Sequence, residues 1–251
     1  MTAPFKDLFS AQSVKYARHR PGYPETLFTY LASLPAGRRL AVDCATGSGQ
    51  AAVGLAPHFN AVVAVDLSRR QLAKALFHPK VSYRAAPAEQ LPVPDASVDL
   101  VSVASALHWF DLDRFYPEVR RVLAPGGVLA AWCFGRGLKI TPEVDAVLER
   151  LAFEVLGPFW EPELRHVWAD YRTLPFPFVE LPAPRFRLHE EWELSRLLGD
   201  LSTWSAVQKY REVRVTDPLE EVGAALRAAW GPPERRRLVS WDICCRLGRR
   251  A

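Results

Sequence analysis

Arg39-Leu-Ala-Val-Asp-Cys-Ala-Thr-Gly-Ser-Gly-Gln50 is the stretch of sequence that decides the fold. It joins an apolar run, which has the composition of a buried strand, to an aspartate and a glycine-rich turn. Gly47 and Gly49 permit backbone dihedral angles and a close approach of other atoms that a Cβ would prevent. The apolar positions of residues 51–56 fit one helix that ends at Pro57. The stretch therefore predicts a strand, a turn and a helix whose N-terminal amides face a nucleotide lying against the main chain.

The same alternation of strands and helices continues along the chain. Ser68 precedes a predicted helix as its N-cap, and a turn at residues 94–97 separates two further strands. We expect strands at residues 61–66, 81–84, 97–104 and 128–133, and helices at residues 68–77 and 115–123. This rhythm is typical of an α/β fold with a doubly wound parallel sheet.

The rhythm breaks near residue 139, where proline and tryptophan become frequent. Helices are expected at residues 190–198, 203–210 and 218–230, and a late strand at residues 238–247. Residues 139–237 are therefore interpreted as an insertion of helices and turns around a sheet that closes late. The chain of 251 residues is long enough for one such domain with a cap.

Composition favours a soluble, cytoplasmic protein. No apolar run approaches the roughly 20 residues that a membrane span needs, and the N-terminus lacks the pattern of an export signal. The cysteines have no C-x-x-C spacing and lie in or beside apolar runs, which indicates free buried thiols in a reducing compartment. These cysteines are Cys44, Cys133, Cys244 and Cys245. We therefore expect no membrane partner and no metal site.

The formal net charge of +4 raises the question of a nucleic-acid partner. Only residues 235–237 and 249–250 form dense runs of arginine. Neither run is interleaved with aromatic residues, as a surface that stacks on bases would require. A solvated surface is the favoured interpretation, so a small molecule is the expected partner and a nucleic acid is not.

The glycine turn and two acids indicate the class of ligand. Two cofactor classes use a glycine turn after the first strand, and Gly47-Ser-Gly49-Gln-Ala-Ala52 satisfies the dinucleotide pattern G-x-G-x-x-A. Asp66 ends the second strand, where a carboxylate can accept hydrogen bonds from both ribose hydroxyls of an adenosine. Asp43 separates the two classes, because an acid ahead of the glycines would repel a pyrophosphate but can anchor an ammonium group. These residues favour an adenosine with an amino-acid end over a nicotinamide dinucleotide.

Three later segments follow in order: Ala85-Ala-Pro-Ala-Glu-Gln-Leu-Pro92, Leu107-His-Trp-Phe-Asp111 and Leu123-Ala-Pro-Gly-Gly-Val128. Together with the glycine turn and Asp66, they make the chain resemble the class I S-adenosylmethionine-dependent methyltransferases. Phe9, residues 17–24, residues 106–111 and residues 203–210 are similar to the methyltransferase type 11 group that includes trans-aconitate methyltransferase-like proteins.

The resemblance implies a Rossmann-like, doubly wound sheet of seven strands, with an antiparallel last strand and an α-helical cap. It also implies that residues 1–251 form a single domain. The implied parts are N-terminal lid helices (1–30), a cofactor-binding core (31–138), a helical cap insertion (139–237) and a last strand that returns to the sheet (238–251).

The resemblance also implies where S-adenosylmethionine binds. The glycine turn would face the methionine part, Asp66 the ribose, and Leu67 with the Ala88 amide the adenine. Ser105 and Trp109 would line the reacting side. The implied cofactor-binding residues are Tyr16, Arg20, Asp43, Ala45, Thr46, Gly47, Gly49, Gln50, Asp66, Leu67, Ala88, Glu89, Ser105, His108 and Trp109.

Two positions depart from the family's pattern. Ala45 replaces the usual first glycine, which is tolerable if Ala45 keeps an ordinary φ. Pro87 replaces an acid that often bonds the adenine amino group, and this removes a side-chain hydrogen bond. Affinity is then expected to be lower, or Glu89 takes over the role.

The implied reaction needs positioning more than any other assistance. Methyl transfer is an in-line displacement at a sulfonium carbon and needs no metal. A carboxylate acceptor is already ionised near neutral pH, and Arg20 or Arg185 could orient it. A hydroxyl would benefit from a base, for which His108 is the candidate; a wall of the cofactor pocket and a packed core residue are its other interpretations. Trp160 and Trp204 are candidate walls of a substrate pocket, or else core anchors of their own helices.

The sequence therefore predicts an enzyme that transfers the S-adenosylmethionine methyl group to a small molecule at a carboxylate or other oxygen, as a monomer or homodimer, with S-adenosylhomocysteine as product. Three alternatives stay open. One is a nicotinamide-dependent oxidoreductase, and a second is a non-catalytic module that binds the cofactor. The third is a nucleic-acid methyltransferase, which would show a salt-sensitive affinity for RNA or DNA.

Overall fold

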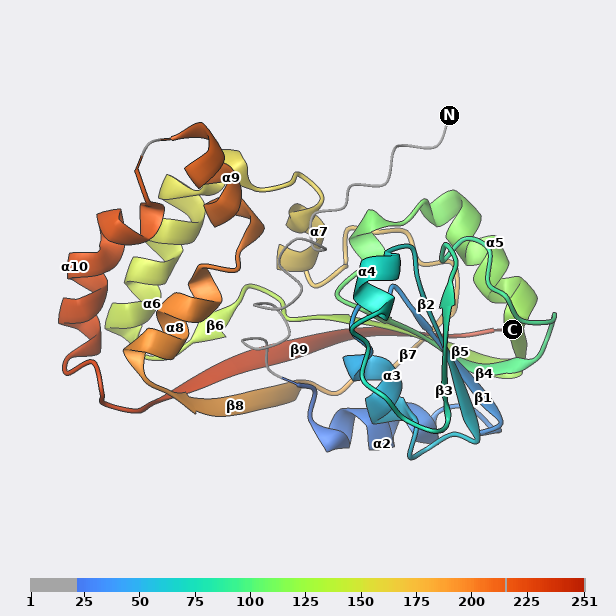
Figure 1. The fold of residues 1–251 in the computed structure, drawn as a ribbon. Helices are drawn as coiled ribbons and strands as arrows, with labels where there is room; N and C mark the ends of the chain where they lie inside the picture. Colours follow the sequence, from blue (N-terminus) through green and yellow to red (C-terminus); the bar gives the residue numbers. More distant parts are fainter. Residues whose placement is uncertain (1–21, 215, 251) are drawn as a thin grey trace. The chain divides into compact units, whose positions relative to one another are not determined.

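The computed structural model describes residues 22–214 and 216–250. These residues form two compact units, each drawn in Figure 1. The core unit comprises residues 22–136, 165–187 and 242–250, and the second unit comprises residues 137–164 and 188–241 apart from residue 215. Tyr16 and Arg20, which were expected to contact the cofactor, lie outside the described residues.

The core unit is built on a mostly parallel sheet. Its main strands are β1 (Leu40–Cys44), β2 (Ala61–Asp66), β3 (Val81–Ala85), β4 (Val98–Ala104), β5 (Leu123–Cys133) and the C-terminal part of β9 (Arg237–Arg249). They lie in the order β3-β2-β1-β4-β5-β9, with β9 antiparallel to β5 and the other pairs parallel. The pairing of β1 with β4 reverses the direction in which the sheet grows, so the doubly wound topology and the antiparallel last strand are confirmed.

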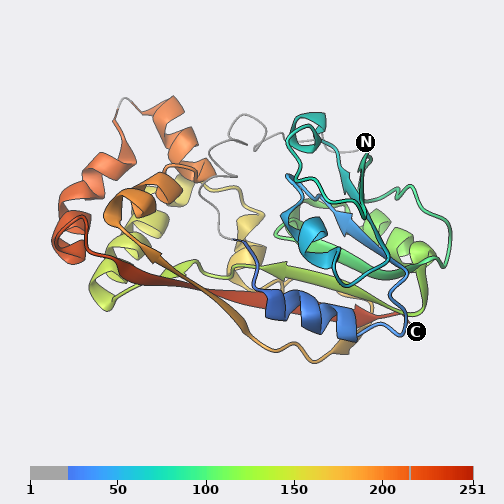
Figure 2. The same ribbon diagram turned by 60° about the horizontal axis from the view of Figure 1, so that its bottom comes forward.

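Both faces of this sheet are covered by helices, as the apolar runs of its strands require. On one face α5 (Leu112–Val122) packs against β1, β4 and β5 through residues such as Phe115 and Val119. On the other face α2 (Glu25–Ser33) and α3 (Gln50–Leu55) bury Leu27, Leu31 and Leu55. Figures 1 and 2 show α5 and α2 on opposite sides of the sheet. Because β1, β2 and β4 are parallel neighbours, their carboxyl ends lie at one edge of the sheet.

Helix boundaries differ from the sequence prediction where tertiary hydrogen bonds intervene. The helix expected at residues 68–77 is only α4 (Arg69–Leu72), with Ser68 as its N-cap as predicted. The chain leaves the helix early because the Leu76 amide donates to the Ser48 carbonyl, 3.0 Å away. That bond ties the segment after α4 to the glycine turn.

The second unit holds α6 (Pro142–Glu149), the short helices η3 (Arg150–Val155) and η4 (Gly157–Phe159), and α8 (Leu194–Leu201), α9 (Ser205–Val213) and α10 (Pro218–Trp230). The bounds of α10 match the prediction, and Asp217 caps it through a 2.9 Å bond from the Leu219 amide. The helix α7 (Leu164–Trp168) leads back into the core unit. No helix among the described residues is long and apolar enough to cross a membrane.

The region between residues 139 and 237 is not purely helical, contrary to the prediction. It contains β7 (Val179–Leu181) and β8 (Phe186–Trp192), which both pair with β9, as does β6 (Leu138–Lys139). The described residues thus form nine strands rather than seven. The strand β7 has only three residues and β8 carries three charged ones, so neither has a clear apolar alternation, and their pairing depends on the long strand β9. The strand β8 also explains why α8 begins at Leu194 rather than at residue 190.

Candidate active site

The glycine turn after β1 adopts the backbone that its composition predicts. Gly47 and Gly49 have φ angles of 57° and 87°, in the region that favours glycine. Among the described residues, a Cβ on Gly47 would meet no atom within 4 Å, so within that part of the chain this glycine leaves the main chain open to a ligand. A Cβ on Gly49 would lie 2.2 Å from the Tyr83 hydroxyl oxygen, so Gly49 is required by internal packing. Only one of the two glycines therefore has the open side that the sequence suggested for both.

Ala45 does not keep the ordinary φ that its tolerance was expected to require. Its φ is 52°, the left-handed conformation that a Cβ disfavours. A glycine would adopt this backbone conformation without strain, so the alanine gives the turn local strain. The turn is held in place by a 2.9 Å hydrogen bond from the Thr46 amide to the Val65 carbonyl of β2.

Asp43 lies below the turn and is fully buried. Its carboxylate oxygens accept hydrogen bonds from the hydroxyls of Thr46, at 2.6 Å, and Ser102, at 2.7 Å. Burial raises the pKa of Asp43 to about 6, although the bonds from Thr46, Ser102 and the Ala52 amide lower it in part. The side chain therefore orders the turn, and its direct contact with a ligand ammonium group stays a prediction.

Asp66 ends β2 beside the turn, as the sequence predicts. One carboxylate oxygen accepts from the Gly47 amide at 2.8 Å, and the other accepts from the Ser68 amide at 2.7 Å. The adjacent Leu67 has 48% of its surface exposed, although it is a large apolar residue. The structure thus brings a carboxylate, an exposed apolar side chain and the open face of Gly47 together at one edge of the sheet, which suits a ribose with an apolar ring beside it.

The segment expected to hold the adenine follows β3. The Ala86 amide donates to the Asp66 carbonyl at 3.2 Å, so this segment lies next to the end of β2. Ala88 is buried, and one Glu89 carboxylate oxygen accepts from the Asp111 amide at 3.1 Å, at the start of α5. Glu89 therefore joins the segment after β3 to the one after β4, and its substitution for the acid absent at Pro87 stays a prediction.

The carboxyl end of β4 brings Ser105, His108 and Trp109 together. Ser105 has a φ of 53°, and its buried Oγ has no hydrogen-bond partner among the described residues. The His108 ring lies 4.6 Å from the Trp109 ring between centroids. Buried polar atoms are normally paired, so the Ser105 hydroxyl at the edge of this site is a group that a ligand can satisfy.

His108 has a partner that the sequence analysis missed. Its Nδ1 lies 3.1 Å from the hydroxyl of Tyr171, which is fully buried. Burial lowers the pKa of His108 to about 3, and the nearby His166 lowers it further. No local pattern identifies Tyr171, because it follows α7 in a stretch that the sequence presented only as turns.

The candidate substrate residues lie in different units. Arg185 is exposed in the core unit. Trp160 and Trp204 lie in the second unit with ring centroids 5.6 Å apart, and the Trp160 indole nitrogen donates to the Ala152 carbonyl at 2.7 Å. Both rings are partly buried, so they are at least part of the packing of that unit.

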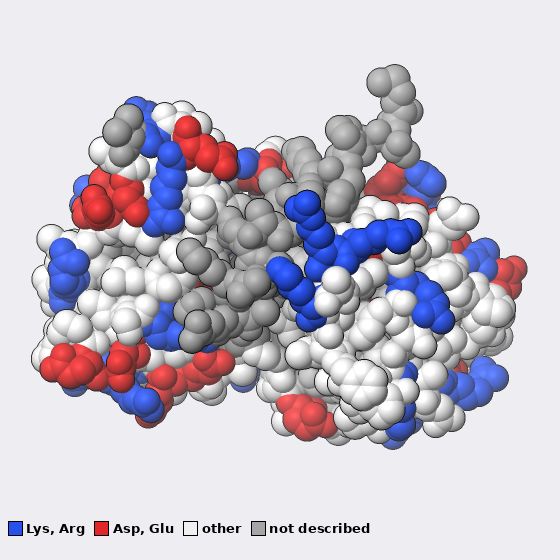
Figure 3. Space-filling model, viewed as in Figure 1, with Lys and Arg blue, Asp and Glu red and all other residues white. Residues whose placement is uncertain are grey.

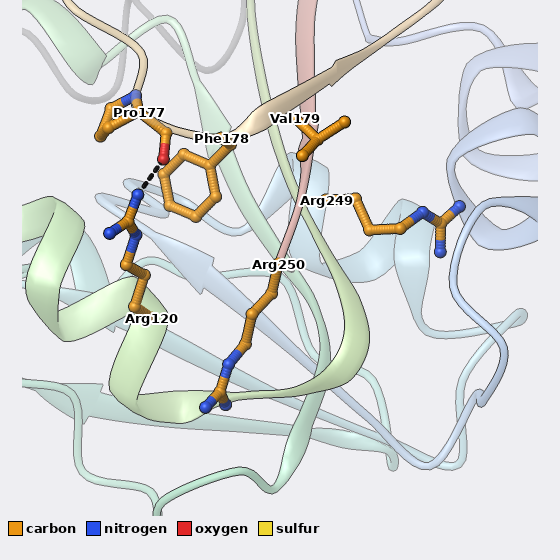
Figure 4. A pocket seen from close by; sticks show the side chains of 6 residues that line it. All are labelled: Arg120, Pro177, Phe178, Val179, Arg249 and Arg250. Carbon is orange, nitrogen blue, oxygen red and sulfur yellow. Dashed lines mark hydrogen bonds between the residues drawn. The ribbon is translucent and has the colours of Figure 1, made fainter.

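A cavity of about 440 Å³ lies elsewhere in the core unit. Its lining residues are Arg120, Pro177, Phe178, Val179, Arg249 and Arg250. Figure 4 shows the three guanidinium groups pointing to different sides, and each donates to a backbone carbonyl. The cavity lies at the start of β5, whereas Ser105 lies near the other end of that strand. These arginines therefore hold neighbouring segments together through hydrogen bonds to backbone carbonyls, and they do not belong to the candidate site.

No group of three or more potential metal-ligating side chains occurs within the described ranges 22–214 and 216–250. The side chains that line the candidate site offer instead hydrogen-bonding groups and apolar surface. Asp66, the open side of Gly47 and the unpartnered Ser105 hydroxyl fit the polar groups of an adenosine that carries an amino-acid end. Fold and site together define a Rossmann-like methyltransferase of class I.

Comparison with known proteins supports the same class. The family described as a methyltransferase domain matches residues 42–131. A Dictyostelium discoideum protein named as a methyltransferase is 34% identical over 230 residues, which cover 90% of this chain and 87% of that protein. A Mycobacterium tuberculosis protein named as an uncharacterized methyltransferase is 34% identical over 201 residues, or 74% of this chain and 80% of that protein.

A solved structure from Anaeromyxobacter dehalogenans, named as a type II methyltransferase, is also similar. It has 51% sequence identity and a TM-score of 0.86, and the match covers 92% of this chain and 97% of that chain. The chain belongs to the class I S-adenosylmethionine-dependent methyltransferases.

Proposed function

We propose that this enzyme methylates a small molecule at a carboxylate or other oxygen, with S-adenosylmethionine bound at the carboxyl edge of β1, β2 and β4. The observation that carries the proposal is the joint placement of Asp66 and the open side of Gly47, which are linked by a 2.8 Å hydrogen bond. Asp66 would hold the ribose, and Leu67 with Ala88 would enclose the adenine. The residues of the turn, Ala45, Thr46, Gly47, Gly49 and Gln50, would face the methionine part, above the buried Asp43.

We propose that the acceptor oxygen is already ionised when it attacks the methyl group. When bound, S-adenosylmethionine supplies a methyl group on a sulfonium, so the acceptor oxygen forms the new bond to carbon while the carbon–sulfur electron pair returns to sulfur. A carboxylate needs no deprotonation for this step. With a pKa of about 3, His108 is too weak a base to take a proton from an alcohol, which favours the wall interpretation of this residue over the base.

The arginine runs support a small acceptor rather than a nucleic acid. Arg236 pairs with Glu191 and Glu193, while Arg237 donates to the Trp230 carbonyl at 2.7 Å. Arg249 and Arg250 donate to carbonyls of their own unit. Figure 3 shows both basic and acidic side chains on the visible face, with large uncharged areas between them. A basic surface that binds nucleic acid would keep its guanidinium groups available.

A reducing cytoplasm is the proposed location. The four cysteines are free thiols, and burial raises the pKa of Cys133 and Cys245 to about 12. Such thiols are protonated and unreactive at neutral pH, as expected for residues that serve only to pack a core.

Isothermal titration tests the cofactor part of the proposal. We expect binding of S-adenosylmethionine and S-adenosylhomocysteine, and none of a nicotinamide dinucleotide. Asp66→Asn should weaken that binding by roughly tenfold or more, because a charge-assisted bond to the ribose is lost. Asp99→Asn is the matched control: like the partly buried Asp66, Asp99 accepts from two amides, Arg39 at 2.7 Å and Leu40 at 3.1 Å, but it is buried at the start of β4. Equal losses in the two variants, or tighter binding of the dinucleotide, would refute the assignment.

A panel of acceptors tests the rest. Carboxylic acids and alcohols with matched carbon skeletons are compared for formation of S-adenosylhomocysteine. Turnover of acids without turnover of the corresponding alcohols is the expected result. Tight cofactor binding without transfer to any member of a broad panel would favour the non-catalytic module, and salt-sensitive RNA or DNA binding would favour a nucleic-acid substrate.

A further inference from the structure

Tyr171 is placed by an unusual backbone. Asp170 and Tyr171 are consecutive non-glycine residues with φ angles of 53° and 60°. Two left-handed residues in a row are costly for side chains with a Cβ, and such strain persists only where the surroundings impose it. The imposing contacts are two hydrogen bonds from the Arg246 guanidinium, to the Tyr171 carbonyl at 2.9 Å and the Leu174 carbonyl at 2.6 Å. The Tyr171 amide also donates to the His166 carbonyl at 2.7 Å.

This backbone conformation places the Tyr171 hydroxyl beside the Nδ1 atom of His108. Tyr171 is fully buried, and its hydroxyl oxygen lies 3.1 Å from His108 Nδ1. The ring centroids of Tyr171 and His108 are 5.8 Å apart, at an angle of 34°. The segment that carries Tyr171 and the segment after β4 are 63 residues apart in the sequence, so the contact is a product of the fold.

Hydrogen-bond accounting assigns the direction of this bond. Among the described residues, His108 Nδ1 is the hydrogen-bond partner of the Tyr171 hydroxyl. If His108 Nδ1 donated to the Tyr171 oxygen, the buried hydroxyl proton would have no acceptor among the described residues, which is costly for a buried polar group. If the hydroxyl donates to Nδ1, both the hydroxyl proton and the Nδ1 lone pair have a partner. His108 then carries its proton on Nε2.

The other ring nitrogen is available. His108 Nε2 has no hydrogen-bond partner in the described part of the chain, and it is not among the fully buried atoms that lack one, so it keeps some exposed surface. Ser105 and Trp109 flank the same short segment. An Nε2–H group at this place can donate a hydrogen bond and cannot accept a proton.

We propose that Tyr171 is a positioning residue that fixes the Nε2–H tautomer of His108, so that His108 donates a hydrogen bond to an anionic oxygen of the methyl acceptor and does not act as a base. The inference rests on the proposed function, because it assigns the chemistry of the acceptor side of the same site. It selects acceptors such as carboxylates, in which one oxygen can receive this bond while the other attacks the methyl group. No proton is transferred in that reaction.

Nitrogen-15 NMR of the imidazole rings in the cofactor-free protein gives a readout that does not depend on activity. His108→Gln assigns the His108 signals. In the wild type we expect a protonated Nε2 and a bare Nδ1, without titration between pH 8 and pH 5. Tyr171→Phe should remove the preference and give a mixture of tautomers. Tyr116→Phe is the matched control, because Tyr116 is a buried tyrosine of the same apolar cluster whose hydroxyl donates to the Pro175 carbonyl at 2.6 Å instead.

Each outcome decides the matter. A wild-type Nδ1–H tautomer, an imidazolium at pH 6, or a spectrum unchanged by Tyr171→Phe would overturn the proposal. If Tyr171→Phe does not fold, the wild-type tautomer alone is sufficient to decide. Failure of S-adenosylmethionine to bind, with the expected tautomer present, would instead remove the proposed function and leave the assignment of Tyr171 intact.

Kinetics with a carboxylic acid acceptor separate a donor from a base. His108→Leu should lower kcat/KM by about a hundredfold, as loss of one preorganised donor does elsewhere. His108→Gln keeps an N–H donor near the Nε2 position but has no basic nitrogen, and it should retain most of the activity. Equal losses in the two variants, with an inflection in the wild-type pH profile near pH 6, would show that His108 acts as a base.

Discussion

Replacement of Ala45 by glycine should relax the turn after β1. Ala45 has a φ of 52°, and the left-handed conformation costs about 1–2 kcal/mol for a residue with a Cβ. Glycine removes that cost but adds about 0.5–1 kcal/mol of conformational entropy to the unfolded chain. The Ala45 methyl is half-buried against the core, and its loss costs about 0.4 kcal/mol, half of a fully buried methylene group. The net expectation is a gain of about 0.5 kcal/mol in the free energy of unfolding.

Ala96 supplies a matched control for this experiment. It has a φ of 49° in the turn before β4, and its side chain is exposed. Ala96→Gly therefore removes the same strain without a packing loss, and it should gain about 0.5–1 kcal/mol. Ala45→Val, in contrast, should cost about 2 kcal/mol or more, because a β-branched side chain tolerates this conformation least.

Denaturant unfolding of the three variants and the wild type, with a common slope, measures these differences. In a chain of this size the gains correspond to about 1–4 °C in Tm. A titration with S-adenosylhomocysteine then separates the two sites, since only Ala45→Gly should change the affinity. If Ala45→Gly destabilises the protein while Ala96→Gly stabilises it, packing of the Ala45 methyl group contributes more to stability than the backbone strain removes. The reasoning would then be wrong.

Two further variants test the buried acid and the second glycine. Folded Asp43 has a pKa of about 6 against 3.8 when exposed, so the unfolded state holds fewer protons between these values and stability falls as the pH rises from about 4 to 6. Asp43→Asn should abolish this pH dependence, which is worth up to about 3 kcal/mol in the free energy of unfolding. If the free energies of unfolding of wild type and variant change in parallel from pH 4 to pH 7, the burial effect on Asp43 is contradicted. Gly49→Ala should cost about 2–3 kcal/mol, because its φ is 87° and its Cβ would lie 2.2 Å from the Tyr83 hydroxyl oxygen. Tyr83→Phe should recover about 1 kcal/mol of that cost in a double-mutant cycle, and no coupling between the two changes would show that Tyr83 is not the obstacle.

The sequence determined the architecture around the turn. The sequence pattern is an apolar run followed by an acid, two glycines and apolar residues at helical spacing. This pattern predicts a buried strand that a turn joins to a helix, and the alternation of strands and helices repeats through β5. In a parallel sheet the carboxyl ends of neighbouring strands share one edge, so Asp66 had to lie near Gly47. Backbone stereochemistry and side-chain periodicity are local properties, which is why these features could be predicted.

Only the tertiary structure decided the chemistry within that frame. The burial that raises the pKa of Asp43, the Tyr83 hydroxyl beside Gly49, and the left-handed φ of Ala45 all depend on segments that pack against the turn from elsewhere. The sequence identified His108 but left its role open, and the partner that restricts it, Tyr171, is 63 residues away in a stretch without periodic pattern. Burial and hydrogen-bond partners arise from contacts between distant residues, and they decide which nitrogen of a histidine carries its proton.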